Sequence, residues 1–184
     1  VGVSRIKIAG FESTGTRIVK EVARAKLPII FSAGIGSSVS MARNTVKWIR
    51  EENPDADITI LHCNNAYPTP IVDINLGQLA KLREIDGVRV GLSDHTEGIL
   101  VPPLAVAMGA TCIEKHFTLS RRLSGPDHPF AIEPVELYEM VYNIRRTELA
   151  IQQKSTELTD SEQSFKMAMR SVVAAKNIKK GDTY

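Results

Sequence analysis

Residues 88–118 read VRVGLSDHTEGILVPPLAVAMGATCIEKHFT, and this stretch decides the fold. A short apolar run at 88–92 ends in polar residues, a segment of helical period follows at 100–108, and a second apolar run occupies 111–116. A strand, a helix and a second strand in this order are typical of a βαβ unit with parallel strands. The stretch therefore predicts an α/β protein built on a parallel sheet.

The same alternation extends in both directions and predicts five βα units. Strands are expected at 5–9, 28–32, 58–63, 88–92 and 111–116, and helices at 16–25, 39–52, 76–85, 100–108 and 135–153. Right-handed crossovers would place each helix on the outside of the sheet. A barrel is favoured over an open Rossmann-like sheet, because polar residues recur at the strand ends and Gly34-Ile-Gly36 lacks the rest of a dinucleotide fingerprint.

Composition is that of an ordinary soluble globular protein. A net charge of +2, from 23 basic and 21 acidic residues, gives no field that would favour nucleic acid or a membrane surface. No apolar stretch approaches the roughly 18 residues that a membrane span needs. Cys63 and Cys112 show no paired or CxxC spacing, which indicates reduced, buried thiols in a cytoplasmic protein. The absence of an initiator methionine and the immediate start in a strand suggest missing upstream sequence.

The C-terminal region changes character after the last long helix. A polar linker at 152–156 is followed by a capped helix start at Thr159, a helix to about Met169, a strand at 171–175 and a turn at 179–182. We expect three segments: a barrel portion at 1–153, a linker with a short helix at 154–170, and the beginning of a small second domain at 171–184.

Two histidines at neighbouring strand ends carry the strongest chemical signal. His95 follows the strand at 88–92 and His116 ends the strand at 111–116, so both imidazoles can point into a barrel mouth and bind one first-row metal. A lone strand-end histidine is more often a satisfied structural residue. The nearby carboxylates of Asp94, Glu114 and Asp127 make the metal reading about as strong as the structural one.

Lys7 is expected to face inward, with Glu12 as a possible acidic partner. A phosphate or carboxylate clamp, a Schiff-base nucleophile and a structural ion pair with Glu12 all fit it. Lys115 lies between Glu114 and His116, so alternation should turn it to the opposite face, and it is discounted as a catalytic lysine.

Two loops add polar groups to the same edge. Ser32 opens a small-residue loop through which backbone amides could approach an anion, although a tight turn explains it almost as well. The loop at 64–70 offers Asn65 and Tyr67 as partners for sugar hydroxyls or an N-acyl group, although such proline-rich loops are often only structural.

Several short motifs occur in a specific order: KIAGFE at 7–12, FSAG at 31–34, HC at 62–63, YP at 67–68, GLSDHT at 91–96, IEKHFT at 113–118, GPD at 125–127, EP at 133–134 and RSVVAAKNIKKG at 170–181. In this order they resemble the N-acetylneuraminate (sialic acid) synthase family, which includes the legionaminic and pseudaminic acid synthases. Gly10 and Phe11 are nearer to the legionaminic and pseudaminic branches.

The resemblance implies a (β/α)8 TIM barrel followed by an antifreeze-like (SAF) domain, in a domain-swapped homodimer that uses Mn2+ or Mg2+. The five strands would be the fourth to the eighth of the barrel. The first three, which carry a catalytic glutamate in the family, would be absent. The reaction implied is condensation of phosphoenolpyruvate (PEP) with an N-acyl amino-sugar aldehyde such as ManNAc, in carbohydrate (sialic acid) biosynthesis by a C–C bond-forming transferase.

The resemblance also implies a role for each matching residue. His95 and His116 would bind the metal, Lys7 and Ser32 would hold PEP with Ser93 nearby, and Glu114 would act as an acid, base or orienting group. The residues expected to contact the amino sugar or position water are Glu12, Asn65, Tyr67 and Asp127.

Two other hypotheses remain open at this point. One is a barrel aldolase that forms a Schiff base on Lys7, and the other is an inactive sugar-binding fragment. The isolated chain is expected to be inactive or poorly stable, because half a barrel leaves sheet edges and apolar surface exposed.

Overall fold

The computed structural model describes residues 2–34, 39–152 and 158–183. The chain divides into two units, Val1–Ile151 and Gln152–Tyr184. The first holds the sheet and its helices, and the second is a short segment with little regular structure.

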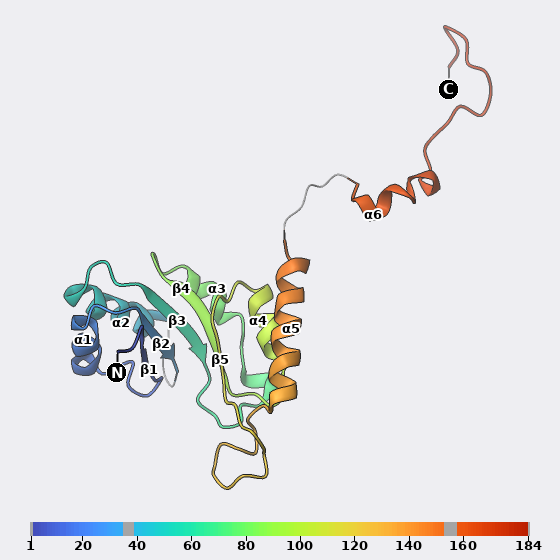
Figure 1. Cartoon of the computed structure of the whole chain (residues 1–184). Coiled ribbons are helices and arrows are strands. Elements are labelled where there is room, and N and C mark those ends of the chain that lie inside the picture. The colour runs from blue at the N-terminus through green and yellow to red at the C-terminus, as the bar shows by residue number, and fades with distance from the viewer. Residues whose placement is uncertain (1, 35–38, 153–157, 184) are drawn as a thin grey trace. The chain divides into compact units, whose positions relative to one another are not determined.

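The first unit is built on five parallel strands in the order β1-β2-β3-β4-β5 (Figure 1). Their bounds are Ile6–Ile8 (β1), Ile29–Ala33 (β2), Ile58–Cys63 (β3), Arg89–Asp94 (β4) and Ile113–Lys115 (β5). Each strand pairs with the next one along the chain, so every crossover moves one position in the same direction. This order is that of a barrel segment and differs from a doubly wound sheet, whose order reverses at a switch point.

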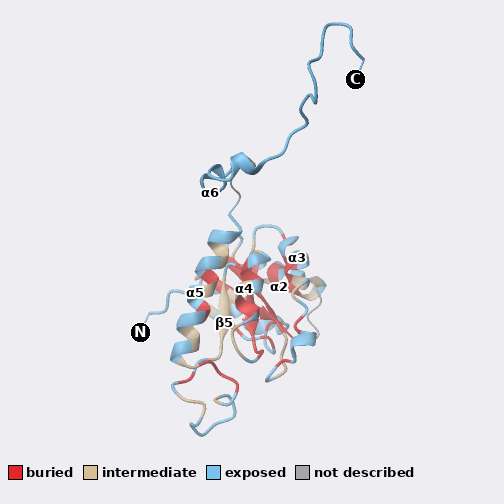
Figure 2. Ribbon diagram, turned by 90° about the vertical axis from the view of Figure 1, so that its right-hand side faces the viewer, coloured by how far each residue is buried: buried red, intermediate tan, exposed pale blue. Residues whose placement is uncertain are grey.

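The helices lie on one face of this sheet. Their bounds are Thr16–Arg24 (α1), Val39–Glu52 (α2), Gln78–Arg83 (α3), Val101–Ala107 (α4) and Pro134–Ala150 (α5), with a 3₁₀ turn at Ile71–Asp73. A single buried cluster joins residues of α1 to α4 with alternate strand residues such as Ile8, Phe31 and Leu92. Figure 2 shows these buried residues in the strands and on the inner sides of the helices, whose outer sides are exposed. The opposite face of the sheet is free of these helices.

One ion pair shows that the sheet is strongly curved. Lys7 on β1 and Glu114 on β5 belong to the two outer strands, yet Lys7 Nζ lies 2.9 Å from Glu114 Oε2. In a flat sheet, four strand spacings of about 4.8 Å would separate them by roughly 19 Å, which is more than the two side chains can span. The chain therefore forms a parallel half-barrel, with the uncovered face on its concave side.

The predicted elements agree closely with this structure. The strand at 58–63 and the helix at 39–52 have the predicted bounds, and the other elements of the first unit differ by at most three residues at either end. The predicted end of the last helix, at 153, falls outside the described residues. Helix α5 begins at a capping box in which Glu133 and Glu136 each bind the other's backbone N–H.

The second unit differs more from expectation. A capping box between Thr159 and Glu162 begins α6 (Asp160–Gln163), a 3₁₀ turn follows at Lys166–Ala168, and Gly181 has a positive φ of 100° in the predicted turn. The strand predicted at 171–175 is wrong. Val172 and Val173 are fully or largely exposed and pair with no neighbouring strand in the described part of the unit, and a strand needs such a partner.

Candidate active site on the concave face

A row of polar side chains crosses the concave face near the carboxyl ends of the strands. Cys63 of β3 pairs in register with Ser93 of β4, and Ser93 pairs with Glu114 of β5. Residues paired in register point to the same side of a sheet, and their neighbours Leu92 and Ile113 face the helices. The alternation of side chains along each strand thus places apolar residues against the helices and polar residues on the concave face.

Glu114 is the centre of this row. Ser93 Oγ donates to Glu114 Oε1 at 2.6 Å, and Lys7 Nζ donates to the same oxygen at 3.1 Å. Burial alone would raise the pKa of Glu114, but the hydrogen bonds from Ser93 and Lys7 outweigh it and leave the pKa below its ordinary value. Of the alternatives open for Lys7, the ion pair with Glu12 is not formed, because curvature brings Glu114 to Lys7 from the far strand.

His95 and His116 lie directly beyond the ends of β4 and β5, with ring centroids 5.2 Å apart. The Nδ1 atom of His95 is 2.6 Å from the carbonyl oxygen of Asn64, so it carries the proton and donates it there. Nδ1 of His116 lies 3.6 Å from Oδ2 of Asp127. The hydrogen bond from Nδ1 leaves Nε2 as the ring nitrogen that His95 can offer to a metal.

The pKa of His95 is lowered, first by burial and then by the neighbouring His116, although its bond to the Asn64 carbonyl opposes both. A neutral imidazole is the form that binds metals. Among the residues that the structure describes, no group of three or more His, Cys, Asp or Glu side chains could hold a metal ion. The two imidazoles alone could supply two ligands, so a metal bound between them would need further donors.

Aromatic rings enclose the two histidines. The ring of Tyr67 lies 4.1 Å from that of His95 and 5.7 Å from that of His116, and Phe130 lies 5.1 Å from His116. Tyr67 precedes a cis peptide bond to Pro68. Burial raises the pKa of the Tyr67 phenol, so it stays protonated near neutral pH and keeps a hydrogen to donate.

Ser32 and Asn65 complete the concave face on the side of β2 and β3. The Ser32 hydroxyl is buried and has no hydrogen-bond partner within the described ranges. Cys63 Sγ donates to Asn65 Oδ1 at 3.7 Å and lies 4.0 Å from His95 Nδ1. Burial raises the pKa of the Cys63 thiol, which favours its neutral, protonated form on the concave face. A buried hydroxyl without a partner suits an oxygen atom of a ligand.

Asp94 and Lys115 lie on the other side of the two strands. Lys115 Nζ donates to Asp94 Oδ2 at 2.7 Å, and both side chains are almost wholly buried. Asp94 Oδ1 also accepts from the Thr96 backbone N–H at 2.9 Å and from its hydroxyl at 2.8 Å. The expectation that Lys115 faces away from Glu114 is confirmed. The expectation that Asp94 flanks the histidine pair is wrong, because Asp94 binds this lysine behind it.

Of the ten residues predicted for the site, most converge on the concave face. Glu12 does not: it is exposed, and its carboxylate has no partner among the described residues. Three contributors were not predicted as site residues: the thiol of Cys63, the carbonyl of Asn64 and the ring of Phe130. The carbonyl leaves no side-chain signal, and nothing in the sequence distinguishes Phe130 from a core aromatic. His62 faces the helices and contacts the carbonyl of Ile74 at 2.6 Å.

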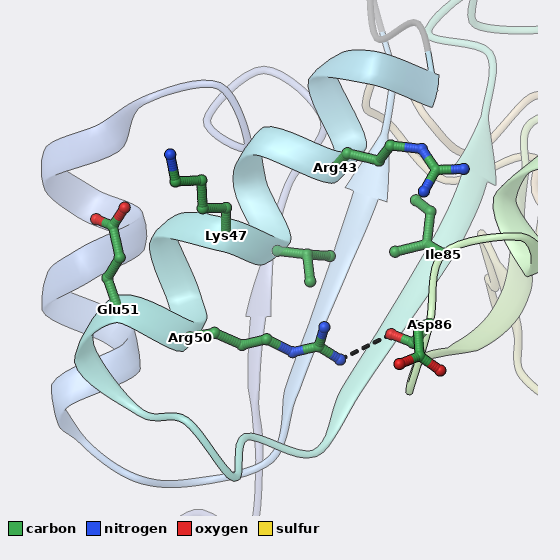
Figure 3. A pocket seen from close by; sticks show the side chains of 7 residues that line it. Arg43, Lys47, Arg50, Glu51, Ile85 and Asp86 are labelled. Atoms are coloured by element: carbon green, nitrogen blue, oxygen red, sulfur yellow. Dashed lines mark hydrogen bonds between the residues drawn. The ribbon is translucent and has the colours of Figure 1, made fainter.

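A hollow outside the barrel is unrelated to this face. It lies between α2 and the segment that leads into β4, where Arg43, Lys47 and Glu51 line it with Asp86 (Figure 3). Arg50 crosses it and donates to the carbonyl oxygen of Asp86 at 2.8 Å. Arg50 is thus already bound to a backbone carbonyl, and none of the predicted site residues lines this hollow.

No helix in the described part of the chain has the length and apolar character of a membrane span.

The chain matches known proteins along almost its whole length. Residues 1–156 match the NeuB family. It is 38% identical over 178 residues to the pseudaminic acid synthase of Campylobacter jejuni, covering 97% of this chain and 51% of that protein. It is 37% identical over 184 residues to the N,N'-diacetyllegionaminic acid synthase of Legionella pneumophila, covering 98% and 52%.

Solved structures agree with the sequence match. The crystal structure of the N-acetylneuraminic acid (sialic acid) synthetase of Leptospira borgpetersenii superposes with a TM-score of 0.81 at 32% identity, over 91% of this chain and 57% of that one. The chain spans about half the length of the curated relatives it matches. From the family match over residues 1–156, together with the half-barrel and its concave polar face, it follows that this chain belongs to the NeuB family.

Proposed function

We propose that the protein containing this chain condenses phosphoenolpyruvate with an N-acyl amino-sugar aldehyde, ManNAc or a relative, to give a nonulosonic acid and phosphate. The observation that carries the proposal is the cluster of Lys7, Ser93 and Glu114 beside the two imidazoles, on the open face of a half-barrel. The pseudaminic and legionaminic acid synthases among its relatives support the same reaction class.

In this proposal, PEP binds on the side of β1 and β2. Its phosphate and carboxylate are anions, and Lys7 offers the one ammonium of the cluster while Ser32 offers an unused hydroxyl hydrogen. Ser32 is buried and the Lys7 side chain is 31% exposed, so hydrogen bonds from these two groups are partly shielded from water and stronger than at an open surface. Glu114 keeps Lys7 in place until the substrate arrives and shares its ammonium afterwards.

The amino sugar binds on the side of β3, β4 and the loop that carries Asp127. Asn65 and Tyr67 supply amide and phenol groups that can pair with hydroxyl or acylamino groups. Asp127 is exposed on the long loop after β5, so it can approach a sugar that enters from solvent. Glu12 is proposed as a further contact or water-positioning group, supported only by its family position.

The metal proposed here is Mn2+ or Mg2+, held in part by His95 and His116 through Nε2. When bound, it would polarise the sugar aldehyde as a Lewis acid. The residues of this chain perform the other tasks. The proposed bond changes are attack of the PEP methylene carbon on the aldehyde carbon, addition of water at PEP C2, and loss of phosphate by C–O cleavage. Glu114 lies where it can take or return a proton through its Oε1–Ser93 hydrogen bond.

A Schiff-base aldolase is the second enzyme candidate, and one contact speaks against it. Both oxygens of Glu114 contact Lys7 Nζ, at 3.1 and 2.9 Å, so this nitrogen is already engaged by a carboxylate and does not point freely at a carbonyl substrate. Borohydride treatment with a carbonyl substrate separates the two mechanisms by mass spectrometry, because only the aldolase predicts a covalent adduct. A sugar-binding fragment without activity is the remaining alternative.

The proposal extends to the organisation of the whole protein. The five strands would be the fourth to eighth of a TIM barrel, residues 154–170 a linker and residues 171–184 the start of an SAF domain, in a cytoplasmic, domain-swapped homodimer. The half-length match to the relatives supports the partial barrel, and the linker, the SAF domain, the location and the dimer are carried over from the family resemblance. The chain alone would be inactive or poorly stable, since β1 and β5 each lack one neighbour among the described strands. A cooperative melt of the isolated chain with bound metal would contradict that.

The test is release of phosphate from PEP by the protein that contains these residues, in the presence of Mn2+ and each of several N-acyl amino-sugar aldehydes. The Lys7→Met variant should raise the KM for PEP by about tenfold or more, because a charged hydrogen bond is worth about 1.5–3 kcal/mol. Lys47→Met, which removes an exposed lysine on the outside of α2, is the matched control and should leave the rate unchanged. No phosphate release with any such aldehyde would sink the proposal.

A further inference from the structure

We infer that Gly10 and Gly34 form a seat for the carboxamide of Asn65, and that the small size of these two positions sets where this amide meets the amino sugar. The inference rests on the proposed function for the identity of the sugar. The packing itself is independent of it.

The seat follows from how little room the two glycines leave. A Cβ atom built on Gly34 would lie 1.7 Å from Asn65 Oδ1 and 2.8 Å from Asn65 Cγ. A Cβ on Gly10 would lie 3.0 Å from Oδ1 and 3.1 Å from Nδ2 of the same side chain. The first contact is impossible and the second is tight, so the amide occupies space that exists only because both positions lack a side chain.

Backbone conformation does not explain the glycines. Positive φ angles occur at Gly87, Gly98, Gly109, Gly125 and Gly181, whereas Gly10 and Gly34 have none. An alanine could therefore adopt the backbone of either position without strain. What an alanine would change at these two positions is the space for Asn65.

The seat brings three strand ends together at the candidate site. Gly10 lies just beyond β1, Gly34 just beyond β2 and Asn65 just beyond β3. On the same face, Cys63 Sγ donates to Asn65 Oδ1 at 3.7 Å, which orients the amide with its oxygen toward the thiol. A carboxamide offers two N–H donors and one acceptor, and this pattern complements a hydroxyl or acylamino group of a sugar. The two glycines thus act as positioning residues for a specificity contact.

The two positions differ in how much they should tolerate. Gly34→Ala must displace the amide, because all three atoms near its Cβ belong to the Asn65 side chain. Gly10→Ala requires a shift of only a few tenths of an ångström, and one of its close contacts, 3.3 Å to Gly34 Cα, is with backbone. The proposal therefore predicts a graded response, with Gly34 the more sensitive position.

A double-mutant cycle on stability tests the seat without any assumption about activity. Gly34→Ala should lower the urea midpoint of the protein clearly, and Asn65→Ala should relieve it, because that change removes the three atoms nearest to the new Cβ. The midpoint of the double variant should equal that of Asn65→Ala. Additive effects of the two changes would overturn the proposal. Gly2→Ala is the control, since a Cβ there meets nothing within 4 Å.

Kinetics of phosphate release test the positioning role. Gly34→Ala should lower kcat/KM for the amino-sugar aldehyde by about a hundredfold, and Gly10→Ala by less, because misplacement by about 1 Å costs this much. The KM for PEP should stay within about twofold of its unaltered value. The double variant Gly34→Ala/Asn65→Ala should have the same kcat/KM for the aldehyde as Asn65→Ala alone, again within about twofold. An equal loss for both substrates would make the seat merely structural and refute its role in specificity. If the unaltered protein releases no phosphate, the proposed function fails, while the stability cycle still decides the seat.

Discussion

The buried pair of Asp94 and Lys115 should be a main determinant of stability, and Lys115→Met tests this. The two side chains are 0% and 4% exposed, and they join the ends of β4 and β5 at positions paired in register. Replacing the ammonium by an apolar group of similar length leaves the Asp94 carboxylate buried with only the two bonds from Thr96. Removing one partner of a buried pair costs about 3–5 kcal/mol.

A second variant separates charge from packing. In Asp94→Asn combined with Lys115→Met, the amide oxygen still accepts from the Thr96 N–H and hydroxyl, and no charge is left in the interior. Two losses remain: the donor to the Thr96 carbonyl, which Lys115 also contacts, and an acceptor for the NH2 group of the new amide. Each costs about 1–3 kcal/mol, less than an unpaired buried charge. The double variant should therefore be more stable than Lys115→Met alone.

The assay is equilibrium unfolding in urea, followed by circular dichroism. With a slope of about 2 kcal/mol per M, a loss of about 4 kcal/mol lowers the midpoint by about 2 M. Arg145→Met is the matched control: it breaks an exposed pair with Glu148 at 2.9 Å on α5 and should cost less than about 1 kcal/mol. The reasoning is refuted if Lys115→Met costs no more than this control, or if the double variant is no more stable than Lys115→Met.

Three further outcomes are expected. Gly91→Ala should destabilise the protein by about 1–3 kcal/mol or more in urea, because its Cβ would lie 2.2 Å from the Cys112 carbonyl oxygen; an unchanged midpoint would contradict this. Burial lowers the pKa of His62 against the opposing bond to a backbone carbonyl, so the folded state favours its neutral form. The stability that neutral His62 contributes is complete above its unfolded-state pKa of about 6.5, and it is lost as pH falls below that value, by at most about 1.4 kcal/mol per pH unit. His62→Gln should flatten this part of the curve of unfolding free energy against pH. Identical curves for the two proteins would refute the role given to His62. His95→Ala and His116→Ala should each weaken Mn2+ binding by at least about tenfold in calorimetry, since each removes a proposed ligand; unchanged affinity would place the metal elsewhere.

The architecture of the first unit could be predicted because its signals are local. Ile58–Cys63 and Val39–Glu52 were predicted to the residue, since apolar runs of β-branched residues and a helical period are both written in consecutive positions. The strand predicted at 171–175 had the same local signal and did not form. A strand depends on a neighbour, and a local pattern says nothing about whether one is present.

The site was predicted less completely because its contacts span long distances in sequence. Alternation correctly turned Lys115 away from Glu114, which needs only the period of a strand. The partner of Lys7 could not be found that way. Glu12 is five residues away, so proximity in sequence favours it as a partner, whereas Glu114 is 107 residues away and reaches Lys7 only because the sheet curves.

The alternation of faces in β4 has a consequence for how this family can change. Ser93 and His95 point to the concave side and Leu92 and Asp94 to the helices, so each side of the strand can accept substitutions with little effect on the other. Deletion of one residue inside Arg89–Asp94 would instead exchange the two sets, turning the imidazole toward the aliphatic side chains under the helices and Asp94 toward the concave face. Evolution of these strands should therefore proceed by replacement at fixed length, while insertions and deletions collect in the connecting loops.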